Sequence, residues 1–366
     1  MKILRSVPYI VGGLASLALL AGCSSSGGSS SALGTTAMNN PEQLGMRPSP
    51  LLSKSHTYVT VKPFKIHRDH HKSRIAPDTK MRPRLLFVSD PGAGDVYIFT
   101  MPALALKGTI TGLGQPQGEC SDNSGNVWVA DTINRELDQY SRAGALLNTL
   151  SDPTGLPLSC AVNLSTGDLA VTQIPDGADD GGVLVYPNAT YPPTEELHNP
   201  SQSTYYFAGY DPSGNLYVSG TDFGGAYMLS EAAAGSTTMS TITISGGTIF
   251  FPGMVQWNLV ANDLVLGDQF CADEQTSCIY STSVSGSTAT ITGTTTLMNF
   301  EGGPVCDMAQ GVVARLARMG AAGGDYEFCS STPSSVDRWH FPAGGVPTNF
   351  NDSIPVVPVG AAISNK

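Results

Sequence analysis

The chain has 366 residues, of which 41% are hydrophobic and 13% are charged, with 41 Gly and 25 Pro. This composition excludes global disorder, and the frequent Gly and Pro are typical of many short strands and turns. Residues 24–84 carry ten Lys or Arg against three acidic residues, whereas residues 85–366 carry seven against 27. So acidic a body excludes nucleic acid as a partner, because phosphates require clustered basic side chains.

The first 22 residues have the pattern of an export signal. Lys2 and Arg5 precede an apolar run, residues 10–21, that is too short for a confident membrane span. The motif Leu20-Ala21-Gly22-Cys23 resembles the lipobox of bacterial lipoproteins, which implies cleavage before Cys23 and acylation of that residue. The residue after this cysteine is Ser24 rather than an acidic residue. In an organism with two membranes, this resembles the pattern of lipoproteins sent to the outer membrane. We therefore expect export and membrane attachment through lipidated Cys23; the alternative is an ordinary secretory signal in which this cysteine is incidental.

Residues 23–84 are expected to form a disordered tether. The stretch 24–45 is rich in Ser and Gly and lacks apolar periodicity, which is typical of a flexible linker. The stretch 47–84 is basic, so it could lie on the acidic body or on anionic lipid headgroups. Histidines between His67 and His71 could bind a metal, but a solvated basic strip is the simpler interpretation.

From residue 85 onward the sequence predicts repeated strands. A short apolar phrase, usually closed by a polar residue or Gly, recurs every 41 to 62 residues. The six copies are Leu86–Asp90, Val127–Asp131, Leu169–Gln173, Leu216–Gly220, Leu264–Asp268 and Tyr326–Ser330. A repeat of this length indicates units that bury their apolar faces against one another.

Each unit is predicted to contain four strands. In the second unit, Gly125 and Asn126 separate two apolar runs and favour a tight hairpin, because both residues tolerate positive φ. Further strands are expected at Glu136–Tyr140 and Ala145–Thr149. Four-stranded units repeated radially make a β-propeller.

The phrase from Pro116 to Asp131, and a weaker copy at 208–220, resembles the NHL-repeat and SMP-30-like propellers. The resemblance covers residues 85–366 and implies the propeller fold, not an activity. The stretch Val312–Gly324 departs from the pattern and is expected to be an insertion or an extended hairpin.

The C-terminus is expected to close the ring. Pro358–Ser364 matches Pro116–Ser121, and the repeats open on a second strand at Leu86, so the last strand would complete the first blade. We therefore expect an all-β, six-bladed propeller over residues 85–366.

Six cysteines follow Cys23, an even number that favours disulfides in an oxidising compartment. Cys271 and Cys278 are expected to close a hairpin, and Cys306 and Cys329 are plausible cross-strand partners. Cys120 and Cys160 are expected on inner strands of adjacent blades, either bonded or as two free buried thiols.

Two enzyme classes share related repeats. SMP-30-like lactonases hold a metal at the channel mouth, and Gly118-Glu119 resembles their opening pair. However, Cys120 follows this pair where a Pro-containing continuation is expected, and Pro252-Gly253-Met254 stands where a metal-binding Asp would precede Gly-Met. Virginiamycin-lyase-like propellers need a histidine base. The body has only His198 and His340, both expected as surface or packed residues.

Three aspartates end their strands at equivalent positions: Asp90, Asp131 and Asp268. They could accept backbone hydrogen bonds, the favoured interpretation, or form an acidic ring at the channel mouth. We expect a lipid-anchored envelope module that binds an envelope protein or a small ligand, without catalysis, metal or cofactor. A metal-dependent hydrolase of the SMP-30 or gluconolactonase type, or a virginiamycin-lyase-like enzyme, is the alternative.

Overall fold

The structure, a computed structural model, describes residues 73–79, 84–176, 181–271, 276–305, 308–313, 321–325, 334–353 and 357–365. All of them belong to one compact unit, Thr35–Lys366. The signal segment, Cys23, most of the tether, Cys306 and Cys329 lie outside the described residues. Among the described residues, no helix is both long enough and apolar enough to cross a bilayer.

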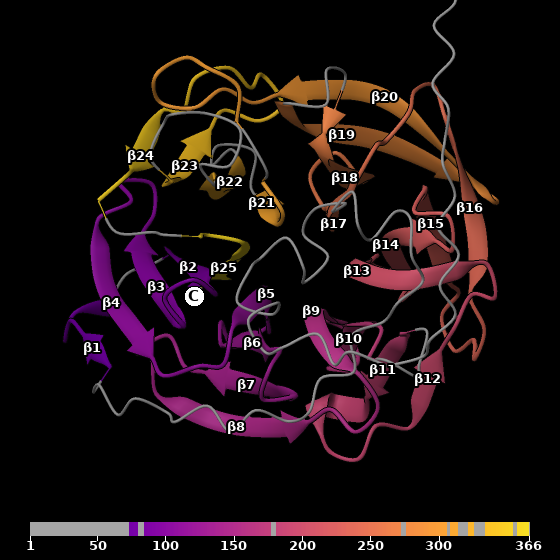
Figure 1. Ribbon diagram of the computed structural model, residues 1–366, viewed down its shortest axis with the longest axis horizontal. Coiled ribbons are helices and arrows are strands. Elements are labelled where there is room, and N and C mark those ends of the chain that lie inside the picture. The colour runs from indigo at the N-terminus through magenta and orange to yellow at the C-terminus, as the bar shows by residue number, and fades with distance from the viewer. Residues whose placement is uncertain are drawn as a thin grey trace, which may run out of the picture. The chain divides into compact units, whose positions relative to one another are not determined.

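The described strands form five sheets arranged around a common axis (Figure 1), and in the one eight-stranded sheet β16 (Ser240–Ser245) pairs in parallel with β20 (Thr288–Thr296). Dividing that sheet at its parallel pair leaves antiparallel groups of strands, which we call blades. From the inner strand outwards, the first blade is β25 (Gly360–Asn365), β2 (Arg84–Asp90), β3 (Asp95–Thr100) and β4 (Leu106–Thr111), and the second is β5 (Pro116–Ser121), β6 (Val127–Asp131), β7 (Glu136–Tyr140) and β8 (Leu146–Ser151). The third is β9 (Leu156–Val162), β10 (Leu169–Ile174), β11 (Val183–Tyr186) and β12 (Glu195–Leu197), and the fourth is β13 (Gln202–Tyr210), β14 (Leu216–Asp222), β15 (Tyr227–Ala232) and β16 (Ser240–Ser245). The fifth is β17 (Pro252–Asn258), β18 (Asp263–Phe270), β19 (Thr276–Ser285) and β20 (Thr288–Thr296), and the sixth is β21 (Gly311–Val313), β22 (Ala321–Asp325), β23 (Ser335–Trp339) and β24 (Asn349–Asn351). A short 3-10 turn, Pro187–Ala189, follows β11. The all-β propeller class expected from the repeats is confirmed.

In the second strand of a blade, successive side chains point to opposite sides and pack against different neighbouring blades. On β2, Leu85 and Phe87 join a buried cluster with Val127 and Val129 of the following blade. The intervening residues, Leu86 and Val88, lie in a different cluster, shared with residues of β22 and β23. Because side chains alternate across a strand, a strand between two blades must be apolar at every position. This explains why the recurring phrases are nearly continuous apolar runs.

Neighbouring inner strands approach one another closely, and this explains the Pro-x-Gly phrase. A Cβ placed on Gly118 of β5 would collide with Ser159 of β9, and one placed on Gly360 of β25 would collide with the backbone of Gln117. Only glycine fits where two backbones come this close. The phrase therefore marks the axis of the ring.

The C-terminal strand completes the first blade, as expected. β25 pairs antiparallel with β2 from Arg84↔Asn365 to Ser89↔Gly360. Arg142, on the loop after β7, donates from Nη1 to the backbone oxygen and the Oγ of Ser364, each at 2.7 Å. The Oγ of Ser364 in turn donates to the backbone oxygen of Gly125. The second blade thus fastens the end of the chain to the first.

The first blade also has a fifth strand, β1 (Arg74–Ile75), which pairs with the outer strand β4. The sequence places these residues in the expected tether. Ile75 packs against the cluster between the first two blades. A Cβ on Gly108 or Gly144 would strike its side chain, so these two glycines leave room for it. A strand of the first blade therefore lies within the residues 23–84 that were expected to form the tether.

The sixth blade corrects one sequence-based prediction. Its second strand was expected at Tyr326–Ser330, but the strand that pairs with β21 and β23 is β22, Ala321–Asp325. Gly323 lies opposite Gly311, and a Cβ on it would come within 2.9 Å of the Met308 Sδ. Because Met308 fills this space, a strand of small residues fits here where an apolar run would not. The described ends of the stretch 312–324 thus belong to the paired strands β21 and β22, which agrees with the hairpin alternative rather than with an insertion.

Asp90 and Asp131, which end β2 and β6, and Asp268, near the end of β18, hold the segments leading into the inner strands. Asp90 accepts a hydrogen bond from the Val357 amide at 3.1 Å, before β25. Asp131 accepts one from the Gly114 amide at 2.7 Å, before β5. Asp268 accepts bonds from the Phe250 and Phe251 amides at 2.9 and 3.0 Å, before β17. The structural interpretation of these residues is therefore confirmed.

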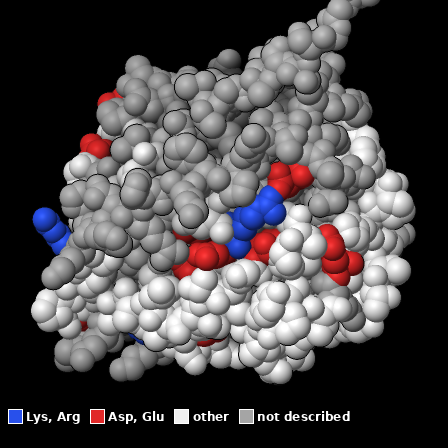
Figure 2. Space-filling model, turned by 60° about the horizontal axis from the view of Figure 1, so that its bottom comes forward, with Lys and Arg blue, Asp and Glu red and all other residues white. Residues whose placement is uncertain are grey.

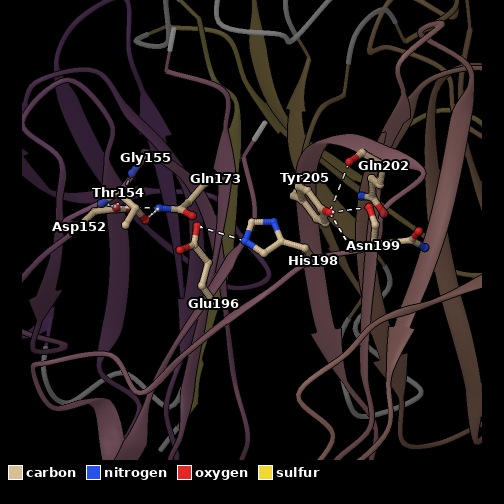
Figure 3. Close-up of polar contacts among 9 residues, drawn as sticks. All are labelled: Asp152, Thr154, Gly155, Gln173, Glu196, His198, Asn199, Gln202 and Tyr205. Carbon is tan, nitrogen blue, oxygen red and sulfur yellow. Dashed lines mark hydrogen bonds and ion pairs between the residues drawn. The ribbon is translucent and has the colours of Figure 1, made fainter. Parts of the chain in front are cut away.

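In the third blade, the segment before the inner strand is also held by a carboxylate, but this carboxylate comes from the loop and not from the second strand (Figure 3). Gln173, near the end of β10, takes the place that Asp has in β2, β6 and β18, and its Nε2 donates to Asp152 Oδ1 at 2.7 Å. The same oxygen accepts the amides of Thr154 and Gly155 at 3.1 and 2.9 Å, before β9. The carboxylate has moved to the loop, but the loop is held in the same way.

We expect deletion of residues 356–366, which removes β25, to lower the free energy of unfolding by several kcal/mol out of the roughly 5 to 15 kcal/mol of a folded domain. The deletion exposes β2 and one face of each flanking blade. Arg142→Ala should cost about 2 kcal/mol through its lost charged hydrogen bonds. The measurement is chemical and thermal unfolding. Deletion of residues 24–70, which spares β1, is the control and should leave the transition unchanged; an equally unaffected C-terminal deletion would contradict closure.

Asp131 makes stability depend on pH. Burial, the main cause, and the nearby Asp138 and Glu136 raise its pKa to about 7, against the hydrogen bonds from Asn134 and Gly114. Unfolded, the carboxyl group titrates near pH 4, so between these values the folded state holds one more proton. Its contribution is full below about pH 4 and is lost as the pH rises through 7.

We therefore expect the free energy of unfolding to fall between about pH 5 and pH 8. Asp131→Asn, which preserves an acceptor for Gly114, should flatten this slope. Urea titrations at a series of pH values measure both effects. A slope of opposite sign, or one that the substitution leaves unchanged, would contradict the assignment.

Candidate functional site

A cavity of about 380 Å³ lies where the inner strands meet. Its walls come from β5, β9, β13, β17, β21 and β25 and from the hairpins that follow several of these strands. The lining residues are Glu119–Ser121, Cys160–Ser165, Ala208–Pro212, Met254–Trp257, Leu259, Gln310–Val313, Ala361–Ile363 and Asn365. Every blade therefore contributes to this one site, which we call the axial cavity.

Gln310, just before β21, ties three inner strands together within the axial cavity. Its Oε1 accepts the amides of Glu119 on β5 and Ala361 on β25, at 2.8 and 3.1 Å. Its Nε2 donates to the backbone oxygen of Glu119 at 2.8 Å and to Ser159 Oγ on β9 at 3.4 Å. The amide thereby satisfies backbone groups that face the axis and have no strand to pair with. Its side chain is consequently fixed.

Glu119 is the most unusual group in the cavity wall. Its side chain is 2% exposed, and neither carboxyl oxygen has a hydrogen-bond partner among the described residues. Burial raises the pKa of this carboxyl group well above its ordinary value. The backbone amide of Ala362 on β25 lies close enough to oppose the shift, but it does not reach hydrogen-bond geometry. The group therefore keeps its proton at pH values where an exposed glutamate is ionised.

The rest of the lining is apolar or weakly polar. Met254, Val255 and Trp257 come from β17, and the indole of Trp257 stacks on Tyr217 with ring centroids 6.2 Å apart. Trp257 Nε1 is buried and has no acceptor among the described residues. A mostly apolar pocket with a few fixed polar groups is typical of small-molecule sites.

The described lining residues include two carboxyl groups and no Lys or Arg. The second, Asp211, is engaged within its own turn: its Oδ1 accepts the amides of Ser213 and Asn215 at 2.8 and 2.9 Å. On the outside, Figure 2 shows a face with small, separate groups of charged side chains and a largely uncharged described surface. The described lining therefore offers carboxyl groups and no basic side chain.

Two cysteine pairs lie at disulfide distance. Cys120 on β5 and Cys160 on β9 have Cα atoms 5.5 Å apart, and their bond joins adjacent blades in the cavity wall. Cys271 and Cys278 have Cα atoms 5.7 Å apart and close the hairpin between β18 and β19, as expected. For Cys120 and Cys160, the bonded alternative is the one observed. The pairing of Cys306 with Cys329 falls outside the described residues.

The histidines considered as bases lie away from the axial cavity. His198 is half exposed beside β12, where its Nε2 lies 3.5 Å from Glu196 Oε1 (Figure 3). Its ring meets Tyr205 edge-on, and that hydroxyl accepts the Asn199 amide at 2.8 Å. His340 is exposed after β23. Neither histidine lines the cavity.

The residues compared with a lactonase site do not form a ligand cluster. Glu119 and Met254 both line the cavity, but the described residues contain no group of three or more His, Cys, Asp or Glu side chains that could hold a metal. Sequence reasoning missed Gln310. Its signal was the Gln-Gly pair, Gln310-Gly311, which repeats Gln117-Gly118 at the start of an inner strand.

Comparisons with known proteins support the repeat assignment. No protein-family model matches the chain. A curated human relative, NHL-repeat-containing protein 4 from Homo sapiens, is 36% identical over 97 residues, which make up 25% of this chain and 75% of the relative. A chain in the crystal structure of a nidogen/laminin complex superimposes with a TM-score of 0.57 at 10% identity, covering 77% of this chain and 98% of that one.

A Bacteroides caccae protein of unknown function superimposes with a TM-score of 0.54 at 11% identity, over 78% of this chain and 100% of that one. Structural likeness at such low identity establishes the fold alone. The sequence match, by contrast, spans three quarters of the relative at more than a third identity. The chain therefore belongs to the NHL-repeat proteins.

Proposed function

We propose that this chain is a lipid-anchored binding module of the bacterial cell envelope, and that the axial cavity is its ligand site. The observation that carries the proposal is the cavity itself: inner strands from all six blades converge on one pocket in which Gln310 is held fixed and Glu119 is unengaged. A closed ring makes such a pocket rigid, and rigidity reduces the entropic cost of binding.

The positions of the reactive groups support binding over catalysis. The recurring aspartates are occupied by backbone amides, as Asp268 shows with two from the segment before β17 and one from Phe270 of its own strand. His198 and His340 are remote from the cavity, so Glu119 has no nucleophile or second ionised group engaged with it among the described residues. General acid–base chemistry usually needs such a partner within hydrogen-bond reach.

The envelope location rests on the sequence. The lipobox-like motif ending at Cys23 would give a membrane anchor, and Ser24 favours the outer membrane. The tether after it would hold the propeller off the lipid surface, and its basic half could lie on anionic headgroups. Disulfides at Cys120–Cys160 and Cys271–Cys278 suit an oxidising compartment outside the cytoplasm.

Cys23→Ser should abolish lipid attachment, because it removes the thiol that would be acylated. We expect the variant to leave the detergent phase in a Triton X-114 partition and to remain unprocessed on a gel. Ser24→Ala, the neighbouring control, should partition like the wild type. A processed Cys23→Ser protein that still enters the detergent phase would contradict the anchor.

The ligand site can be tested without knowing the ligand. We expect a small-molecule extract of the envelope to raise the melting temperature of the purified protein, since a bound ligand stabilises the folded state by mass action. Native mass spectrometry should show the retained mass. Ser121→Trp, at the cavity end of β5, should fill the pocket and abolish both effects.

Ser287→Trp is the matched control, because Ser287 lies on the exposed turn between β19 and β20, outside the cavity lining. It should respond to the extract like the wild type. If neither a mass nor a shift appears, or if Ser121→Trp responds equally, the proposed site is wrong. A retained compound that is released chemically altered would favour the hydrolase or lyase alternative.

A further inference from the structure

We propose that the axial cavity takes a small primary amine with an apolar body, and that Glu119 is the charge partner of its ammonium group. This inference rests on the proposed function, because it names the ligand class of the same cavity. Three observations carry it: the unengaged carboxyl group, the absence of basic side chains from the described lining, and the apolar walls.

The carboxyl group of Glu119 is costly as it stands. A buried polar group without a hydrogen bond destabilises a fold by about 1 to 3 kcal/mol, and an ionised one by more. Gln310, which is close by, avoids this cost because both its Oε1 and its Nε2 make hydrogen bonds. Glu119 has only the nearby Ala362 amide on β25, which does not reach hydrogen-bond geometry, so both of its carboxyl oxygens remain without a hydrogen bond among the described residues. A ligand that donates hydrogen bonds would complete the site.

The charge of the lining selects a cation. Glu119 and Asp211 are the only carboxyl groups among the described lining residues, and no Lys or Arg competes for them. A metal ion is disfavoured, because hard cations need several oxygen ligands and no such cluster is present in the described chain. A quaternary ammonium has no N–H to donate. A primary ammonium supplies both the charge and the donors.

The apolar part of the ligand would meet β17 and its neighbours. Met254, Val255 and Trp257 line the cavity together with Val312 and Ile363, the latter two from β21 and β25. These walls offer dispersion contacts and no compensating charge. They therefore favour an amine that carries an aliphatic or aromatic body over a compact polyamine.

Binding should release a proton. The free carboxylic acid and the alkylammonium would give a carboxylate–ammonium pair plus one proton to solvent, because a cation within about 4–6 Å favours the ionised carboxyl form. The strands β9, β21 and β25 beside β5 carry no titrating side chain, whereas β2 carries Arg84 and Asp90 and β6 carries Asp131. In the lining, Tyr210 and Asp211 are the other titratable groups.

The probe pair is 2-phenylethylamine and its uncharged analogue 2-phenylethanol, titrated calorimetrically into the full-length wild-type protein. We expect the amine to bind at least about tenfold more tightly than the alcohol. Titrations in phosphate and in Tris, which differ in ionisation enthalpy, should show about one proton released per amine and none per alcohol. Equal affinities, no amine binding, or binding without proton release would overturn the proposal.

Glu119→Gln tests the residue, since glutamine has the shape of the protonated carboxyl group. The variant should melt at or above the wild-type temperature and lose the preference for the amine. Glu196→Gln, on an exposed glutamate outside the cavity lining, should keep both the preference and the proton release. If Glu119→Gln binds the amine like the wild type, Glu119 is not the charge partner. If Glu119→Gln fails to fold, the number of protons that the wild type releases per bound amine still tests the proposal.

The two levels of the proposal fail separately. If the envelope extract yields a ligand that Ser121→Trp loses and Glu119→Gln retains, the ammonium assignment is wrong and the binding module stands. If the extract yields no ligand in the wild type and 2-phenylethylamine also fails to bind, both the ammonium assignment and the proposed ligand site in the axial cavity are wrong.

Discussion

The structure depends on one constraint: each blade is apolar on both faces and must have a neighbour on each side. The alternation on β2, where Leu85 packs forward and Leu86 packs back, shows the constraint within a single strand. A linear stack of such blades would leave two apolar ends, and a ring leaves none. The pairing of β25 with β2 and the bonds from Arg142 to Ser364 therefore stabilise the whole ring, not only the strand they hold.

Closure also creates the site. Inner strands that converge on an axis present backbone groups with no further strand to pair with, and their glycines, such as Gly118 and Gly360, let them approach closely. Gln310 satisfies some of these groups by bridging β5, β9 and β25. The space left over is the axial cavity, where Glu119 is buried without a partner among the described residues. The proposed ligand site at the axis is thus a by-product of the geometry that stabilises the fold.

The acidic residues that stand out in the sequence are not the acidic residue that is unusual in the structure. Asp90, Asp131 and Asp268 recur with the repeat because each of them holds the segment before an inner strand. Gln173 with Asp152 shows that the need, rather than the residue type, is what repeats. Glu119 recurs in no other blade, and an unrepeated polar residue at a repeated position is where a function specific to this chain is most readily sought.

The sequence by itself determined the strand pattern, the hairpin turns and the closing strand, because apolar alternation, positive-φ residues and the Pro-x-Gly phrase are local signals. It failed at β22, since the Ala and Gly of Ala321–Asp325 carry no apolar signal and fit only because Met308 lies against them. It left the Cys120–Cys160 bond open and missed Gln310, and it gave Glu119 only a family resemblance. Those features arise from contacts between residues 40 to 191 positions apart, which exist only once the ring has closed.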